Sequence, residues 1–268
     1  MKNPYISIVI PTYNDDELLK ECLQSIQLQS YNNFEVIVVD NNSSVDITEL
    51  VGSFGKKYTL IHEKKQGIVY ARNAGFNKSR GSLIARLDAD SRLPSDWLER
   101  LFEFSKNQND VRWAVTGPGD FYNAKFKRFH SGIHSAVYYY VNRFLLGHYL
   151  LWGSNMAITK EAWLDVKDKV CLTNSIHEDM DLSSHLYMEK IPIFYHKTLK
   201  ASMKLKRMDS SPRILWKYLY KWTHSLSRHN KVAGLLCYPL AGMVFIFGIT
   251  VGVLLVWAES ENHINRLS

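Results

Sequence analysis

The sequence predicts an α/β fold built on a mostly parallel central sheet. Over the first half of the 268-residue chain, short apolar segments alternate with segments whose apolar residues recur at helical spacing. The apolar segments are continuous, which is typical of strands covered by helices on both faces. A hydrophobic content of 46% and a charged content of 22% also fit a globular protein with a substantial core.

The expected elements can be placed in order along the chain. We expect strands over residues 5–10, 34–39, 59–62, 83–87, 113–116 and 193–196. Helices are expected over 16–29, after Asp46, over 67–77, 95–105, most of 124–151, and 180–189. Ser95 is expected to cap the helix over 95–105, because a serine hydroxyl accepts an unpaired N–H of a first turn. Asp46 is expected to cap the helix that follows it in the same way.

Polar residues follow several of these strands at the point where each strand ends. In such sheets ligands bind outside the carboxyl ends of the strands, so we expect these residues to form one site. They are the turn Pro11-Thr12-Tyr13-Asn14, Asp40, and the pair Asp88 and Asp90 with Ala89 between them.

The two carboxylates after the fourth strand predict a metal site. Residues i and i+2 of a strand lie on one side, so Asp88 and Asp90 point together. Carboxylates that close repel each other unless a cation lies between them. Mg²⁺ or Mn²⁺ prefers such oxygen ligands and often shares them with substrate phosphates.

The positive charge of the chain is concentrated in one segment. The formal net charge is +7, and eight lysines and arginines lie between residues 201 and 232 against one acid, Asp209. The rest of the chain is therefore neutral. The three cysteines, Cys22, Cys171 and Cys237, are too far apart for a disulfide framework, which favours a reducing, cytosolic setting.

The C-terminal part predicts a membrane anchor. Residues 232–258 contain no charge, and about 20 apolar residues span a bilayer as a helix. Basic and aromatic residues precede this run, as is usual on the cytoplasmic side of a span. We therefore expect a single-pass anchor with the catalytic domain in the cytosol and no secretory leader. The alternatives are a buried core helix and a re-entrant helix.

These observations divide the chain into four parts. Residues 1–200 are expected to form one domain, with a nucleotide-binding half over 1–119 and an acceptor half over 120–200. A basic amphipathic connector follows over 201–231, then the anchor over 232–258 and a short tail over 259–268.

Five motifs in this order resemble the family 2 glycosyltransferases, inverting enzymes of the Rossmann-like GT-A fold for nucleotide-diphospho-sugar transferases. They are Ile8-Val9-Ile10-Pro11-Thr12-Tyr13-Asn14, Val38-Val39-Asp40-Asn41-Asn42-Ser43-Ser44, Gly67-Ile68-Val69-Tyr70-Ala71-Arg72-Asn73-Ala74-Gly75, Asp88-Ala89-Asp90 and Glu178-Asp179. The resemblance covers about residues 5–200.

The resemblance implies a donor site and a metal site. Asp90, with Asp88, would hold Mn²⁺ or Mg²⁺ against the donor diphosphate. The alternative for Asp88 is a contact with ribose or water. Asp40 would accept hydrogen bonds from the nucleobase, and Tyr13 would stack on it. Pro11, Thr12, Asn14, Arg72 and Ala89 would line the donor site. The alternatives are a turn role for Asp40, core packing for Tyr13 and a surface ion pair for Arg72.

The resemblance also implies the acceptor side. Asp179 would act as the base, with Glu178 setting its orientation. Gly153-Ser154-Asn155 resembles the acceptor loop, the alternative being a plain turn. His196 is a candidate third metal ligand, a surface histidine being the alternative.

The predicted function is transfer of one sugar, with UDP-sugar as the expected donor and a lipid-linked glycan as the expected acceptor. The Gln-x-x-Arg-Trp motif of processive relatives is absent, which disfavours polymer synthesis. The expected partners include membrane lipids but no nucleic acid. The alternative is a catalytically idle, membrane-tethered module that binds the nucleotide sugar. The sequence leaves the sugar, the linkage and the oligomeric state open.

Overall fold

The computed structural model describes residues 6–123, 132, 135–204, 212–232, 234–239 and 242. The chain divides into two compact units. The sheet unit lies within Met1–Asn174 and Glu178–Leu205, and the C-terminal unit lies within Ser175–His177 and Lys206–Ser268. We describe each unit by itself.

A seven-stranded sheet in the order β3-β2-β1-β4-β7-β5-β8 forms the centre of the sheet unit. Its strands are β1 (Ile6–Thr12), β2 (Phe34–Asp40), β3 (Tyr58–His62), β4 (Leu83–Arg86), β5 (Ala114–Thr116), β7 (Met156–Thr159) and β8 (Ile193–Tyr195). Only β7 runs antiparallel to its neighbours, β4 and β5. The short strands β6 (Gly119–Phe121) and β9 (Ala201–Met203) pair separately. The prediction of an α/β fold with a mostly parallel sheet is confirmed.

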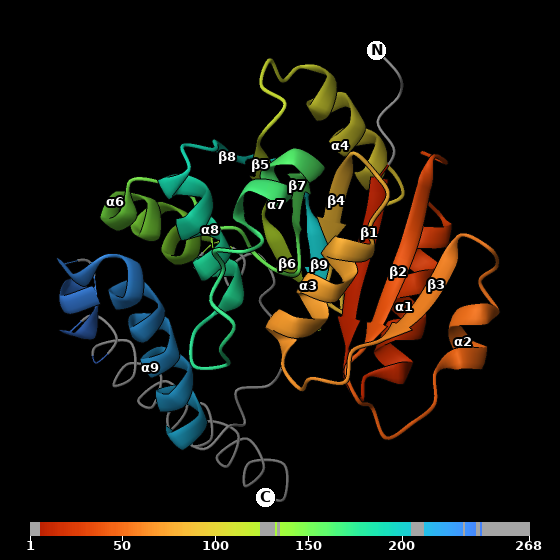
Figure 1. Ribbon diagram of the computed structural model, residues 1–268, viewed down its shortest axis with the longest axis horizontal. Coiled ribbons are helices and arrows are strands. Elements are labelled where there is room, and N and C mark those ends of the chain that lie inside the picture. Colours follow the sequence, from red (N-terminus) through yellow and green to blue (C-terminus); the bar gives the residue numbers. More distant parts are fainter. Residues whose placement is uncertain are drawn as a thin grey trace, which may run out of the picture. The chain divides into compact units, whose positions relative to one another are not determined.

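Helices cover both faces of this sheet. Figure 1 shows α3 on the near face and α1 behind the strands. The helices of the sheet unit are α1 (Asp16–Gln27), α2 (Thr48–Gly52), α3 (Ile68–Lys78), α4 (Trp97–Lys106), the π-helix η1 (Ala136–Val141), α6 (Asn142–Leu146), α7 (Lys160–Val166) and α8 (Glu178–Met188).

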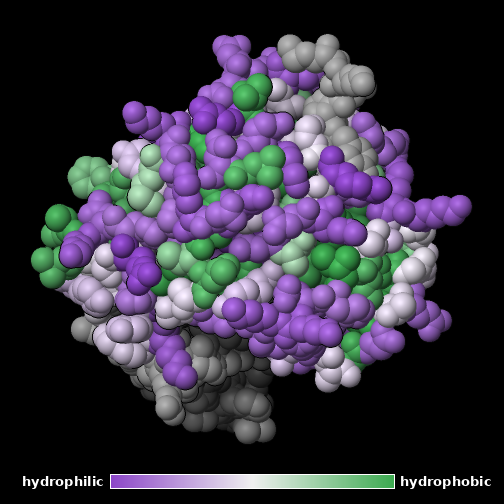
Figure 2. Space-filling view, viewed as in Figure 1, coloured by the Kyte–Doolittle hydropathy of each residue, from purple (hydrophilic) through white to green (hydrophobic). Residues whose placement is uncertain are grey.

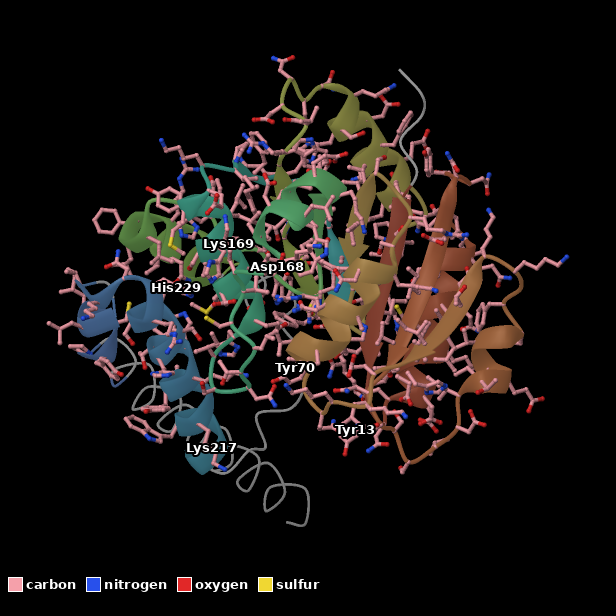
Figure 3. All side chains as sticks on the ribbon, viewed as in Figure 1. Tyr13, Tyr70, Asp168, Lys169, Lys217 and His229 are labelled. Carbon is pink, nitrogen blue, oxygen red and sulfur yellow. The ribbon has the colours of Figure 1, made fainter. Side chains whose placement is uncertain are left out.

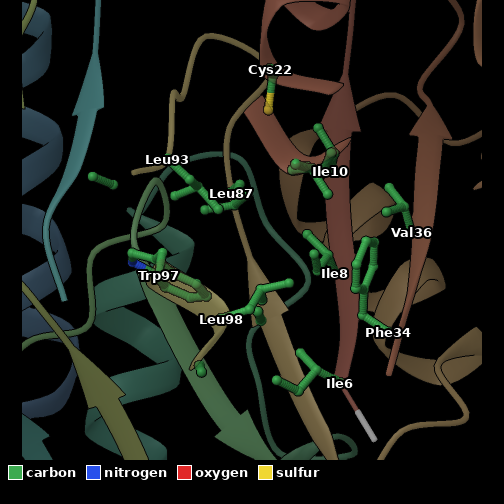
Figure 4. Close-up of a cluster of buried hydrophobic side chains, with 14 of the residues drawn as sticks. Ile6, Ile8, Ile10, Cys22, Phe34, Val36, Leu87, Leu93, Trp97 and Leu98 are labelled. Atoms are coloured by element: carbon green, nitrogen blue, oxygen red, sulfur yellow. The ribbon is translucent and has the colours of Figure 1, made fainter. Parts of the chain in front are cut away.

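The core consists of two apolar layers separated by the sheet. Ile6, Ile8 and Ile10 of β1 share one layer with residues of α1 and α4, and Figure 4 shows these isoleucines beside Trp97 and Leu98. Val9 belongs to the other layer, which includes residues of α3, α7 and α8. This alternation along β1 explains why apolar residues occur on both faces of the strand. Figure 2 shows a mostly polar exterior with apolar side chains in separate patches.

The strand order makes the boundary between β1 and β4 a topological switch point. The chain passes from β1 to β2 and β3 on one side, and then crosses to β4 on the other side of β1. At such a switch point the connections leave the two strands in opposite directions, so ligands bind between their carboxyl ends. Thr12 ends β1 there, and Asp88 follows β4.

Two local predictions need correction. Ser95 does not cap α4, which begins at Trp97 without a side-chain cap at Asp96. The side chain of Gln29 provides the acceptor instead, because its Oε1 accepts the N–H of Leu98 at 2.9 Å. The sequence analysis also missed β6, β7, α7 and β9, which have only three to seven residues each.

Asp46 lies one residue before the N-cap position of α2, which is Ile47 and has no side-chain cap. The Oδ1 of Asp46 nevertheless accepts the N–H of Thr48 at 2.9 Å, so the residue stabilises the start of the helix without occupying the predicted cap position. The expected helix over 124–151 lies partly outside the described residues. Its described part contains η1 and α6.

The C-terminal unit contains the helix α9 (Pro212–His229), in which Leu219, Trp222 and Leu226 are buried, whereas Trp216 and Tyr220 are exposed. Among the described residues, no helix combines the length and apolarity needed to cross a membrane. Most of the run 232–258 lies outside those residues, so the anchor stays a prediction.

Candidate active site

The turn after β1 is tied to the turn after β2. Asn14 adopts a left-handed conformation with φ of 53°, and its Oδ1 accepts the N–H of Ser44 at 2.8 Å. The hydroxyl of Ser43 in return accepts the N–H of Asn14 at 3.0 Å. Tyr13 lies at the edge of the sheet where β1 ends (Figure 3), and it is 51% exposed. The core-packing alternative for Tyr13 is therefore wrong, and its ring is accessible to a flat ligand.

Asp40 lies at the end of β2 and is almost fully buried. Its Oδ1 accepts the N–H of Ser43 at 3.1 Å, and its Oδ2 lies 3.2 Å from Nδ1 of His62. These contacts are typical of an aspartate that stabilises a turn, which was the alternative interpretation of Asp40. The nucleobase contact stays a prediction.

Asn41 is a positioning residue that sequence reasoning missed. Its Nδ2 donates to the carbonyls of Glu63 and Lys65, at 2.9 and 2.8 Å, and its Oδ1 accepts the N–H of Gly67 at 2.7 Å. Gly67 precedes α3 with φ of 139°, a conformation that favours glycine. Asn41 therefore connects β2 to the start of α3. The sequence feature that could have identified Asn41 is its position directly after Asp40, the last residue of β2.

The Asp88–Asp90 pair lies beside the switch point. Oδ1 of Asp88 accepts Nη2 of Arg86 at 2.9 Å, and its Oδ2 accepts a short hydrogen bond from Ser154. Cys22 lies beneath the pair, with its Sγ 3.7 Å from the Asp88 carbonyl. Burial, and then the negative charges of Asp90 and Asp88, raise the pKa of this thiol. Asp88 and Asp90 are therefore both close enough to Cys22 to act electrostatically on its thiol.

Arg86 connects the Asp88–Asp90 pair to the acidic pair at the start of α8. Its Nη1 donates to Oε1 of Glu178 at 2.7 Å, and the side chain is 2% exposed. Burial alone would lower the pKa of this guanidinium, but Asp88 and Glu178 outweigh it and raise the pKa. A Cβ on Gly153 would lie 2.0 Å from Nη1, so only glycine leaves room for the arginine.

Asp179 is held by three donors. Its Oδ2 accepts the N–H of Gly153 and the hydroxyl of Tyr138, each at 3.2 Å, and its Oδ1 accepts the N–H of Met180 at 2.8 Å. The first turn of α8 adds the positive end of the helix dipole. Tyr138 was missed, because its segment read only as an aromatic helix. Its single hydroxyl proton is shared between Asp179 and the Leu151 carbonyl, which lies 2.7 Å away.

Arg72 is fully buried, which makes the surface ion-pair alternative wrong. Its Nη1 donates to the carbonyl of Glu178 at 2.6 Å, and its Nε donates to Oδ1 of Asn73 at 3.0 Å. Burial lowers the pKa of Arg72 to about 10. Arg72 thus supports the backbone that carries the acidic pair, and a phosphate would reach it only after this segment moved.

The segment Gly153-Ser154-Asn155 runs between the two acidic pairs. Gly153 contacts Asp179 and Ser154 contacts Asp88, as described above. Asn155 is buried: its Oδ1 accepts Nε1 of Trp97 at 3.1 Å, and its Nδ2 donates to the Leu199 carbonyl at 2.7 Å. The first two residues therefore border the candidate site, whereas Asn155 anchors the segment in the core.

His196 follows β8 beside a shallow cleft lined mainly by α4. Its ring packs against Phe104 at 5.0 Å between centroids, and its Nδ1 lies 3.0 Å from the Thr198 hydroxyl. Burial, and then the charge of Arg100, lower the pKa of His196. Its role as a third metal ligand stays a prediction, for which these contacts give no support.

The donor set at the switch point fits a hard divalent cation. Asp88 and Asp90 supply only oxygen ligands, as Mg²⁺ and Mn²⁺ prefer. Arg86 already balances part of the charge of Asp88, at 2.9 Å. Asp90 is 7% exposed and lies near the same buried thiol. The residues present can therefore hold such an ion.

The chain is similar in sequence to a named glycosyltransferase. Glycosyltransferase AglE of Haloferax volcanii is 38% identical over 103 residues, which cover 36% of this chain and 34% of AglE. The match therefore spans about a third of that relative.

Two solved structures share the fold. The mannosyltransferase PcManGT of Pyrobaculum calidifontis, in complex with GDP-Man and Mn²⁺, superposes with a TM-score of 0.64 at 16% identity, covering 96% of this chain and 81% of that one. TarS 1–349 of S. aureus, in complex with UDP-GlcNAc, gives 0.61 at 17% identity, covering 84% and 67%. The α/β architecture is thus the GT-A fold.

The family model for "Glycosyl transferase family 2" matches residues 7–169, more than half of the chain. The chain therefore belongs to glycosyl transferase family 2.

Proposed function

We propose that this protein is a metal-dependent, inverting glycosyltransferase that moves one sugar from a nucleotide-diphospho-sugar to a hydroxyl acceptor. The observation that carries the proposal is the connection between the two acidic pairs. Arg86 bonds to both Asp88 and Glu178, while neighbouring residues Gly153 and Ser154 contact Asp179 and Asp88. The proposed site for the leaving group and the candidate base are therefore joined by one network of hydrogen bonds.

Asp179 is the proposed base. It would take the proton of the acceptor hydroxyl while that oxygen forms a bond to the anomeric carbon. On the opposite face the bond to the diphosphate breaks, and the nucleoside diphosphate leaves with the electron pair. Asp179 suits this role because three donors fix its orientation, whereas Glu178 is paired with Arg86.

Asp90 is the proposed direct metal ligand, with Asp88 beside it. Asp88 already shares its charge with a buried arginine, which weakens it as a metal ligand. A bound Mn²⁺ or Mg²⁺ would stabilise the negative charge that develops on the leaving diphosphate. The presence of Mn²⁺ in the PcManGT complex supports this assignment.

The proposed donor is a UDP-sugar. The exposed ring of Tyr13 and the carboxylate of Asp40 lie at the ends of neighbouring strands, where they suit stacking and hydrogen bonding to a base. The UDP-GlcNAc complex of TarS supports UDP, whereas the GDP-Man complex of PcManGT supports a guanine nucleotide. A panel containing both nucleotides decides between them.

The proposed acceptor is a lipid-linked glycan at a membrane surface. Lys217 and Lys221 of α9 lie among the exposed aromatic residues Trp216 and Tyr220. Anionic lipid surfaces attract basic segments, and aromatic rings favour the headgroup region. We extend this proposal to a cytosolic domain held at the membrane by the run 232–258.

The test is transfer of radiolabelled sugar from a panel of UDP- and GDP-sugars in the presence of Mn²⁺. We expect one donor to be used, and Asp179→Asn to lower turnover by about 10²–10⁴-fold. The matched control is Asp168→Asn, the same change at an exposed position of the sheet unit, which should leave turnover unchanged. Wild-type turnover in Asp179→Asn would overturn the assignment of the base. Binding of a nucleotide sugar and Mn²⁺ without transfer or hydrolysis would favour the idle binding module instead.

A further inference from the structure

A second group of metal-ligating side chains lies beside α8, away from the Asp88–Asp90 pair. Cys171 lies in the loop between α7 and α8, a few residues after the Asp168 and Lys169 labelled in Figure 3. Asp181 and His185 are four residues apart on α8 and therefore share one face of that helix. The Cys171 sulfur, an Asp181 carboxylate oxygen and a His185 ring nitrogen all lie within 4.8 Å of one another.

The spacing of Asp181 and His185 suits a shared ion better than a direct bond. Nε2 of His185 lies 3.6 Å from Oδ1 of Asp181. That distance is too long for a hydrogen bond. Two ligand atoms bound to one tetrahedral zinc ion lie roughly 3.4 Å apart, given bonds of roughly 2.0–2.2 Å.

The carboxylate of Asp181 is oriented for such a role. The side chain is buried, and its Oδ2 accepts the N–H of Cys171 at 2.8 Å. This bond leaves Oδ1 directed toward His185, and it fixes the backbone that carries the cysteine sulfur. Hydrogen bonds of this kind commonly orient metal ligands. A bound cation would also offset the cost of burying the carboxylate.

We propose that Cys171, Asp181 and His185 form a structural site for a zinc-like divalent ion. Thiolate and imidazole ligands favour Zn²⁺ over Mg²⁺ or Mn²⁺, so this site differs in preference from the all-oxygen site at Asp90. The three residues supply one sulfur, one oxygen and one nitrogen ligand. The ion would join the loop of Cys171 to α8, the helix whose first turn carries Asp179.

The experiment is a titration of the metal-free full-length protein with Co²⁺, which replaces Zn²⁺ and gives a sulfur-to-metal charge-transfer band. We expect one band with a stoichiometry of one ion, lost when Zn²⁺ displaces Co²⁺. Cys171→Ser should remove the band, and His185→Gln should weaken binding by more than the roughly 10–100-fold that an outer-shell change costs. Cys237→Ser, which removes a thiol elsewhere in the chain, is the matched control and should bind as the wild type does.

A second measurement on the wild-type protein covers the case in which a variant fails to fold. Zn²⁺ should slow the alkylation of Cys171, followed on its own peptide by mass spectrometry, and Mn²⁺ at the same concentration should not. Absence of the charge-transfer band, wild-type binding by Cys171→Ser, or equal alkylation with and without Zn²⁺ would overturn the proposal. Because these readouts do not involve sugar transfer, they are independent of the proposed enzyme activity.

Discussion

At the scale of single residues, one guanidinium joins two carboxylates, one of which lies 92 positions away from it in the chain. Arg86 bonds to Glu178 at 2.7 Å and to Asp88 at 2.9 Å, and almost none of its surface reaches solvent. Removing one partner of a buried ion pair leaves the other charge uncompensated, which costs more than the pair itself contributes.

Arg86→Met should therefore lower the free energy of unfolding by about 3–5 kcal/mol. Combining it with Glu178→Gln should recover part of this loss, because one of the uncompensated carboxylates is then removed. Urea denaturation of both variants measures the effect. Arg100→Met is the control: its ion pair with Asp96 is partly exposed, and its loss should cost at most about 1 kcal/mol. A single-variant loss as small as that of the control would contradict the role of Arg86.

The space beside Arg86 gives a second prediction. Gly153→Ala places a Cβ 2.0 Å from Nη1 of Arg86, whose guanidinium could move away only by disturbing its ion pairs with Asp88 and Glu178. We expect reduced stability and a large loss of sugar transfer, because Gly153 also donates its N–H to Asp179. Gly52→Ala is the matched control, since a Cβ there has no atom within 4 Å. It should be neutral or stabilising by up to about 1 kcal/mol. Equal melting temperatures for the two variants would refute the steric argument.

At the scale of elements, one glutamate joins two strands to the connection between α3 and β4. Oε1 of Glu35 in β2 accepts the hydroxyl of Ser7 in β1 at 2.7 Å and the N–H of Arg80 at 2.9 Å. Its Oε2 accepts Nε of Arg80 at 2.8 Å. Burial alone would raise the pKa of Glu35, but the hydrogen bonds from Arg80 and Ser7 outweigh it and lower the pKa below the usual 4.5.

The direction of the Glu35 pKa shift determines how its contribution to folding stability changes with pH. Because the folded pKa is lower than the unfolded one, Glu35 stabilises the fold above the usual 4.5, and this contribution is lost as the pH falls through the folded pKa. Glu35→Gln should be less stable than the wild type at neutral pH, and the difference should shrink in acid. Urea denaturation as a function of pH measures it, with Glu49→Gln, an exposed change in α2, as the control. A difference that grows in acid would contradict the sign.

The amphipathic helix α9 gives a prediction about lipid surfaces. Basic residues near an anionic bilayer each contribute about 1 kcal/mol to binding, so Lys217→Gln with Lys221→Gln should weaken binding to anionic vesicles by about 30-fold. The double variant Lys20→Gln with Lys78→Gln changes the net charge equally on exposed positions of the sheet unit and serves as the control. Vesicle sedimentation measures both. Equal weakening by the two variants would assign the effect to net charge rather than to α9.

At the scale of the whole molecule, the sequence predicted what depends on local pattern. The strands β1 to β4 and the helices α1 to α4 have continuous apolar runs or helical periodicity, and they appear within a few residues of their expected places. The positions of Asp40 at the end of β2 and of Asp88 shortly after β4 follow from this pattern. Asp90 lies in the turn after β4 rather than on the strand itself. The identity of the catalytic groups still awaits the experiments above.

The features that sequence reasoning missed depend on contacts between distant segments. The strand β7 has four residues, and only its pairing with β4 and β5 defines it. The burial of Arg72 depends on the carbonyl of Glu178, which lies 106 positions away. The Gln29 side chain that replaces Ser95 at α4 comes from the end of another helix. In each case the interacting residues are too far apart in the sequence to lie in one short segment, so local sequence patterns could not reveal the contact.

The reversed direction of β7 has a consequence for how this protein can diversify. Because β7 pairs Met156 with Arg86, the residues just before it lie beside those just after β4, and Ser154 meets Asp88. The segment between β6 and β7 thus ends beside Asp88, in the region proposed for the donor. The pairing of β7 with β4 and β5 fixes the register of the residues that follow this segment. Exchanging this one insertion between homologues offers a route to new acceptor specificities on an unchanged scaffold.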